Sequence, residues 1–139
     1  MDRDELVDAL NGDLSTEFRS IVQYVQHIAT VKGAEFVSTI DELRAHVGQE
    51  LQHALRLAEQ VEFLGGVPTT SVPDIPSTSD SREALSLDLE LERAQLARYR
   101  ERTQQAVELG LPDVAEALRP LLEQTQEHVR DLQAVLDIA

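Results

Sequence analysis

Apolar residues recur at alternating intervals of four and three residues along four stretches of the chain. This spacing places them on one face of an α-helix, where they can pack against other helices. The second stretch is the most regular, and apart from Glu50 its series consists of Phe36, Ile40, Leu43, Val47, Ala54, Leu57, Val61 and Leu64. The pattern predicts four helices, at about residues 3–32, 35–64, 81–109 and 112–138.

Local signals mark the ends of these helices. Asp2 and Asp80 each precede a glutamate by three residues, which is the pattern of a capping box. A glycine follows each of the first three predicted helices, and Pro112 suits the first turn of the fourth. The boundaries of the helices are therefore predicted independently of their apolar faces.

Between the second and third helices the chain reads VPTTSVPDIPSTSDS, with three prolines and neither helical nor strand periodicity. A loop of this length can run the length of a helical bundle. Aromatic residues make up only 4% of the chain, which also favours helices over sheet. We expect an all-α fold in one domain, residues 1–139, built as an antiparallel four-helix bundle with a long crossover between the second and third helices.

The net charge of −14 excludes some classes of partner. Nucleic acid is not expected, because its phosphates must be neutralised by lysine and arginine, and the chain has only one lysine, Lys32. The chain has no cysteine, which excludes disulfides and thiolate metal sites. No signal peptide or membrane-spanning run is visible. We expect a cytoplasmic protein without a membrane partner.

The second half of the sequence matches the first after a shift of 75 residues. The shift places Glu17 on Glu92, Tyr24 on Tyr99, His53 on His128 and Glu50 on Thr125. In each half a glutamate is followed 36 residues later by a histidine. The two halves are therefore predicted to be helical hairpins that each bring a carboxylate and an imidazole to a shared centre.

Five of these polar residues interrupt the apolar faces of the helices: Glu17, Glu50, His53, Glu92 and His128. Burial of an unpartnered carboxylate costs on the order of several kcal/mol. No lysine or arginine lies at an inward-facing position to compensate the charge. Carboxylates with imidazoles suit iron, manganese or zinc, and bundles of this kind usually hold a pair of metal ions.

The chain resembles the bacterioferritins, within the ferritin-like family, over nearly all of its length. The matching segments are TEFRSIVQYVQH, QELQHALRLAEQVEFLGGVP, LDLELERAQ and LEQTQEHVRDL. The resemblance implies that Glu17 and His53 bind one iron, that Glu92 and His128 bind another, and that Glu50 bridges the two. It also places Thr125 where the family has a second bridging glutamate.

Thr125 changes the charge of the expected centre. Two divalent ions carry four positive charges, which four glutamates would cancel and three do not. An exogenous anion could supply the remainder, whereas Glu123 and Glu127 are poorly spaced from His128 on a helix. Gln124 could offer a neutral oxygen. We expect a weakened metal pair or a single ion.

Two further family features are missing. Leu51 stands where the resemblance implies a haem-binding methionine, so no haem is expected. The sequence also ends at Ala139, without the fifth helix of cage-forming relatives. We expect a homo-oligomer, either a dimer or a larger assembly.

Two tyrosines and two further histidines are also considered in relation to the expected ligands. Tyr24 and Tyr99 lie two helical turns from Glu17 and Glu92 and are expected to pack nearby, with a hydrogen bond to the site. His46 lies one turn before Glu50 and could guide ions inward or lie at the rim. His27 is expected to be exposed to solvent.

The leading hypothesis is an iron-binding protein that takes up Fe(II) inside the bundle and oxidises it with O₂. The alternative is a degenerate, non-catalytic bundle that binds at most one ion, with water and protonated carboxyls in its polar core, and acts as an oligomeric scaffold or binding module. A DNA-protecting mini-ferritin is disfavoured, because those relatives place metal between subunits and this chain has no basic tail.

Overall fold

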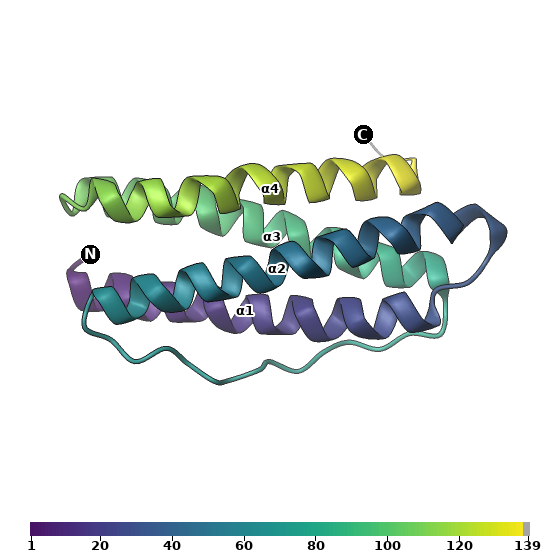
Figure 1. The fold of residues 1–139 in the computed structure, drawn as a ribbon, viewed down its shortest axis with the longest axis horizontal. Helices are drawn as coiled ribbons and strands as arrows, with labels where there is room; N and C mark the ends of the chain where they lie inside the picture. The colour runs from purple at the N-terminus through teal and green to yellow at the C-terminus, as the bar shows by residue number, and fades with distance from the viewer. Residues whose placement is uncertain (138–139) are drawn as a thin grey trace.

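The computed structural model describes residues 1–137, and these form an antiparallel four-helix bundle (Figure 1). The helices are α1 (Arg3–Thr30), α2 (Val37–Phe63), α3 (Ser81–Glu108) and α4 (Pro112–Leu136), with a short 3₁₀ turn, η1 (Ala34–Phe36), before α2. The predicted all-α bundle with a long crossover between its second and third helices is confirmed.

The helix ends differ from the predicted ones by a few residues. α1 ends at Thr30, and α2 begins at Val37 because residues 34–36 form the 3₁₀ turn after Gly33. The expected end of the fourth helix at residue 138 lies outside the described residues. Asp2 and Asp80 cap α1 and α3 as predicted, since each side chain accepts a backbone hydrogen bond 2.8 Å long.

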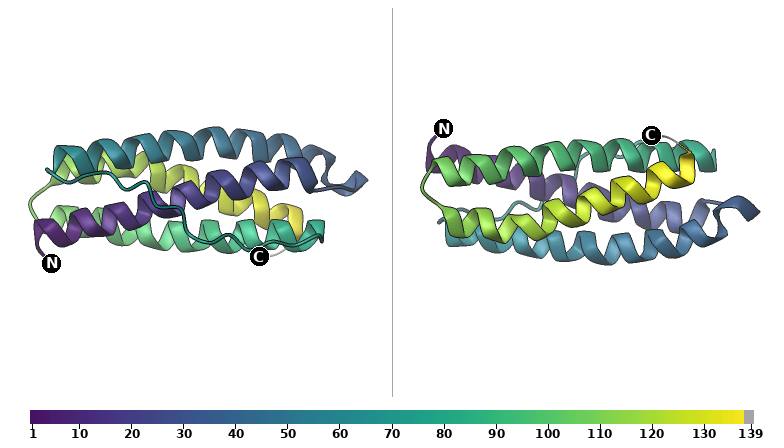
Figure 2. Two further views of the ribbon diagram at one scale, coloured as in Figure 1. Left: turned by 90° about the horizontal axis from the view of Figure 1, so that it is seen from below. Right: turned by 90° about the horizontal axis from the view of Figure 1, so that it is seen from above.

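The crossover lies along the length of the bundle (Figures 1 and 2). Two side chains of α1 fasten its first part. Asn11 donates to the carbonyl of Val67 and accepts from the amide of Thr69, and Ser15 donates to the carbonyl of Ser71. Polar residues on the outer side of α1 thus satisfy backbone groups of a loop that has no secondary structure of its own.

The apolar core is divided into two clusters, one toward each end of the bundle. One cluster contains Leu6, Leu10, Leu14, Leu57, Val61 and Leu118, and the other contains Leu43, Leu85, Leu89, Leu132 and Leu136. The helices run antiparallel, so the middle of each helix falls between the clusters. A layer of buried polar residues occupies this middle section.

Two buried acid–base pairs join α1 to α3. Arg102 binds Asp13 through its Nε, at 2.7 Å, and through a second guanidinium nitrogen at 3.0 Å. Its side chain is buried, so the expectation that no arginine faces inward is wrong. His27 lies 2.8 Å from Asp88, which also accepts a hydrogen bond from Gln23. The 75-residue shift relates these two pairs, because it places Asp13 on Asp88 and His27 on Arg102.

The expected exposure of His27 is therefore wrong. Its side chain is only 1% exposed, because it pairs with a carboxylate from a different helix.

None of the described helices has the length and hydropathy needed to cross a membrane.

Candidate metal centre

The five predicted ligands come together in the polar layer, and each is at most 1% exposed. α1 supplies Glu17, α2 supplies Glu50 and His53, α3 supplies Glu92 and α4 supplies His128. They form two groups, in each of which one ligand atom per residue lies within 4.8 Å of the others. Glu50 belongs to both groups, with Glu17 and His53 in one and Glu92 and His128 in the other.

Glu50 offers one oxygen to each histidine. Its Oε1 lies 2.9 Å from Nδ1 of His128, and its Oε2 lies 3.2 Å from Nδ1 of His53. The outer carboxylates are somewhat further from the imidazoles, with Glu92 at 3.3 Å from His128 and Glu17 at 3.7 Å from His53. Both imidazoles thus face the carboxylates with the same nitrogen, Nδ1.

Several candidate ligand atoms of this layer are buried and have no hydrogen-bond partner among residues 1–137. They are Oε2 of Glu17, Oε2 of Glu92 and Nδ1 of His53. A buried polar group left unsatisfied costs about 1–3 kcal/mol. Oxygen and imidazole donors that converge and lack partners fit divalent first-row metals, so the residues present suit the expected cofactor.

The pKa of one of the three carboxyl groups is raised, and that of the other two is lowered. Burial raises the pKa of Glu50 well above its usual value, and the charges of Glu17 and Glu92 raise it further. Burial also opposes ionisation of Glu92, but the contacts of this carboxylate with His128 and Glu50 outweigh it and lower the pKa of Glu92 to about 2. The pKa of Glu17 is lowered in the same way against its burial, by Glu50 and His53.

The two tyrosines bind the carboxylates across the bundle. Tyr24, on α1, donates to Oε1 of Glu92 on α3 at 2.8 Å, and Tyr99, on α3, donates to Oε1 of Glu17 on α1. Burial, followed by the nearby carboxylates, raises the pKa of both hydroxyls well above the usual value, so they remain donors. Each tyrosine therefore binds the glutamate of the opposite half.

Two glutamines lie behind the histidines. Gln124, expected as a possible neutral oxygen near His128, has its Oε1 at 2.7 Å from Nε2 of His53. Gln49 makes the equivalent contact with Nε2 of His128. Sequence reasoning missed Gln49, although the 75-residue shift places it on Gln124.

Gln95 was also missed. Its amide donates to Glu17 at 2.8 Å and to the hydroxyl of Tyr99 at 3.2 Å. The repeat gave no signal here, because the counterpart of Gln95 is Ser20. The hydroxyl of Ser20 is buried and has no hydrogen-bond partner in the described part of the chain.

His46 and Thr125 mark the asymmetry between the halves. The His46 side chain is 3% exposed, stacks on His128 with ring centroids 3.9 Å apart, and contacts Asp131 through Nε2. It therefore lies inside the bundle beside a ligand and not at the rim. Thr125 is buried, and its hydroxyl donates to the backbone carbonyl of Leu121, one turn earlier in α4.

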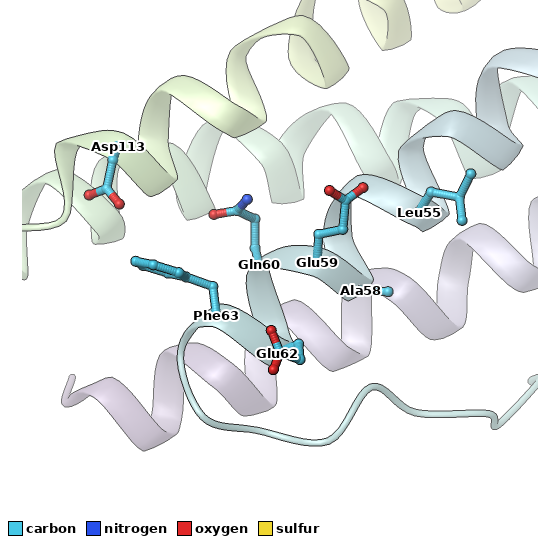
Figure 3. A pocket seen from close by; sticks show the side chains of 7 residues that line it. All are labelled: Leu55, Ala58, Glu59, Gln60, Glu62, Phe63 and Asp113. Carbon is cyan, nitrogen blue, oxygen red and sulfur yellow. The ribbon is translucent and has the colours of Figure 1, made fainter.

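Two surface pockets lie along α2. One of about 720 Å³ near the C-terminal end of α2 contains none of the five ligands (Figure 3). Another, of about 210 Å³, lies between α2 and α4, and its lining includes His53, Gln124 and Arg56. The second pocket brings solvent-accessible space next to the His53 half of the site.

The fold and site define a ferritin-like protein. The family model of the ferritin-like domain matches residues 7–139, and the chain belongs to this family. The chain is similar to a ferritin-like diiron-carboxylate protein from Bacillus anthracis strain Ames, with 31% identity, 98% of each chain covered and a TM-score of 0.92.

Two other solved structures connect it with the bacterioferritins. The bacterioferritin-related protein of Bacteroides fragilis, a dodecameric thioferritin, shares 28% identity over 99% of this chain and 87% of its own, with a TM-score of 0.84. A bacterioferritin from Rhodobacter capsulatus, with a metal-free dinuclear site and a haem iron, shares the fold at 24% identity and a TM-score of 0.86, over 96% of this chain and 84% of its own. The resemblance inferred from the sequence motifs is confirmed.

Two relatives among the characterised proteins carry names that refer to DNA. The DNA protection during starvation protein of Halobacterium salinarum is 29% identical, over 96% of this chain and 79% of its own. The nutrient stress-induced DNA-binding protein of a Synechococcus species is also 29% identical, over 88% of this chain and 76% of its own.

Proposed function

We propose that this protein binds iron inside its helical bundle, and that Fe(II) bound there is oxidised by O₂. The position of Glu50 carries the proposal. A single buried carboxyl group presents one oxygen to each of two imidazoles, while the outer carboxylates each keep an unpaired oxygen. This is the arrangement that two cations sharing one bridging ligand require.

The residues divide between two ion positions. Glu17 and His53 would hold one ion, and Glu92 and His128 would hold the other. Glu50 would bind both ions. When bound, iron supplies the redox chemistry, and the chain contributes oriented ligands whose side chains are each at most 1% exposed. Manganese or zinc can compete for the same donors. Haem has no part in the proposal, because the side chain of Leu51 offers no ligand atom.

Anaerobic titration with Fe(II), followed by exposure to O₂, tests the proposal. We expect saturation at about two ions per chain, and an oxygen-dependent absorbance in the near ultraviolet. Glu50→Gln should abolish binding of the pair, whereas Glu123→Gln, a change to an exposed acid on α4, should have no effect. Absence of any binding by the wild-type protein would remove the proposed function.

A second candidate function is a bundle that binds at most one ion and serves as a scaffold without catalysis. Thr125 favours it, because the position expected for a second bridging carboxylate carries a hydroxyl that is already bonded to the helix backbone. This candidate predicts one ion per chain or fewer, and no consumption of O₂ after Fe(II) is added.

DNA binding is not part of the proposal, despite the names of the two relatives. The chain carries 26 acidic residues against 12 lysines and arginines, and an acidic protein repels the phosphate backbone. We expect no shift of duplex DNA in an electrophoretic assay at low salt. A shift that disappears as the salt concentration rises would place the protein functionally with those relatives.

Self-association in the cytoplasm is part of the proposal. The thioferritin of Bacteroides fragilis is dodecameric, and in the present chain the outer side of α2 exposes Leu51 and Leu55 to half of their full extent. Light scattering during size-exclusion chromatography is expected to show a dimer or a larger assembly.

A further inference from the structure

Each candidate ligand histidine is contacted from behind by a glutamine of the opposite helix. His53 of α2 has its Nε2 2.7 Å from Oε1 of Gln124 in α4. His128 of α4 has its Nε2 2.5 Å from Oε1 of Gln49 in α2. The 75-residue shift converts one contact into the other, so the same arrangement occurs twice in a site whose bridging carboxylate occurs only once.

The chemistry of the amide decides which imidazole nitrogen carries hydrogen. An amide oxygen can only accept, so Nε2 of each histidine must be the donor. In a neutral ring Nδ1 is then the nitrogen with a free lone pair. This is the nitrogen that faces Glu50 in both histidines, and in His53 it has no hydrogen-bond partner.

We propose that Gln49 and Gln124 are positioning residues that present Nδ1 of His128 and His53 to the metal ions. The inference rests on the proposed metal site. Metal-binding histidines generally donate their second ring nitrogen to an acceptor that fixes the tautomer and the ring orientation. In this chain that acceptor is neutral, so the three glutamates remain the only anionic ligands.

A merely structural role for the glutamines would have a different signature. Both glutamine side chains are only partly buried. Gln49 reaches from α2 to α4 and Gln124 from α4 to α2, so their contacts could simply hold these two helices together. Their loss would then lower the stability of the metal-free protein and leave the affinity of the folded site unchanged. A positioning role instead predicts a lower metal affinity of the folded site and an unchanged stability of the metal-free protein.

Zinc affinity, measured by competition with a chromophoric chelator, separates these roles. Gln49→Leu and Gln124→Leu should each weaken zinc binding by about 10- to 100-fold, with little change in the urea midpoint of the metal-free protein. Gln124→Glu should tighten binding by roughly threefold or more, because a charged acceptor makes a stronger hydrogen bond. Gln126→Glu is the matched control, since it adds the same charge at an exposed position of α4 and should leave the affinity nearly unchanged.

Nuclear magnetic resonance of the metal-free protein, labelled with ¹⁵N at histidine, provides a readout independent of metal. We expect exchange-protected Nε2–H signals from His53 and His128. Gln124→Leu should shift the signal of His53 alone, and Gln49→Leu that of His128 alone. Gln124→Glu and Gln49→Glu serve the same purpose should a leucine variant fail to fold.

Failure of this inference can be told apart from failure of the proposed function. A wild-type protein that binds no zinc but shows the two Nε2–H signals with their expected shifts defeats the metal site and leaves the positioning of the rings intact. Unprotonated Nε2 atoms, or glutamine variants that change neither the spectra nor the zinc affinity, would overturn the inference.

Discussion

Glu50 on α2 lies 2.9 Å from Nδ1 of His128 on α4, although 78 residues separate the two in the chain. Burial raises the pKa of the Glu50 carboxyl group well above its usual value. The charges of Glu17 and Glu92, which the same group faces, raise it further. We therefore expect Glu50 to retain a proton in the metal-free site. Two predictions depend on this proton.

The first concerns stability of the metal-free protein as a function of pH. The folded state binds the Glu50 proton more tightly than the unfolded chain, so its contribution is fully present below the unfolded carboxyl pKa and is lost as the pH rises through the raised folded value. In EDTA, wild type should lose stability relative to Glu50→Gln as the pH increases above the ordinary carboxyl range. Urea denaturation at a series of pH values measures this difference, and parallel curves for the two proteins would contradict the account.

The second concerns protons released on metal binding. An ion that takes Glu50 as a ligand must displace its proton. Calorimetric titration with zinc, in buffers of different ionisation enthalpy, should show proton release at neutral pH, and the release should fall by about one proton in a Glu50→Gln variant that retains an ion. Equal release from both proteins would show that Glu50 is ionised before binding.

The third prediction concerns the missing carboxylate. Thr125→Glu would supply the fourth negative charge at the position that the repeat pairs with Glu50. The weaker of the two ions should bind at least about tenfold more tightly, equivalent to roughly 1.4 kcal/mol. Thr125→Val serves as the control, because the Thr125 hydroxyl bonds only to the Leu121 carbonyl and its loss should leave metal affinity nearly unchanged. A glutamate variant with the wild-type affinity for both ions would mean that residue 125 does not face them.

The fourth prediction concerns the buried ion pair of α1 and α3. Arg102→Leu leaves Asp13 buried without its partner, and burial already raises the pKa of this carboxyl against the opposing effect of Arg102. The variant should lose about 3–5 kcal/mol of unfolding free energy. Asp13→Leu combined with Arg102→Leu should recover most of this loss, since neither charge then remains buried.

An exposed ion pair provides the comparison for Arg102. Arg44 and Asp41 of α2 form one in which both side chains are more than half exposed. Arg44→Leu should change the unfolding free energy by at most about 1 kcal/mol. A similar effect of the Arg44 and Arg102 variants would show that the pair between α1 and α3 is not desolvated in solution.

The helices and the five candidate ligands could be predicted because each leaves a periodic trace in the sequence. Apolar spacing marks the inner face of every helix, and Glu17, Glu50 and Glu92 appear as charged interruptions of that face. The repeat adds the histidines, because His53 and His128 lie at equal distances from Glu17 and Glu92. Periodicity and repetition are properties of the sequence alone, so they can be recognised before the fold is known.

The residues that were misjudged or missed depend on contacts between helices. A histidine outside the apolar face looks like a surface residue until Asp88, 61 residues away, is placed against His27. Gln95 contacts Glu17 from another helix, and its counterpart in the other half is not a glutamine but Ser20. The 3₁₀ turn before α2 was also missed, because its residues suit a helix as well as those of α2 do. The structure separates the turn from α2 by a backbone hydrogen bond from Phe36 to the carbonyl of Gly33.

Anomalous diffraction from crystals loaded with iron, recorded above and below the iron absorption edge, tests the central claim most directly. We predict two iron peaks inside the bundle, one beside Nδ1 of His53 and one beside Nδ1 of His128, with the carboxylate of Glu50 between them. Iron found only at the protein surface, with these three side chains directed away from one another, would contradict the account.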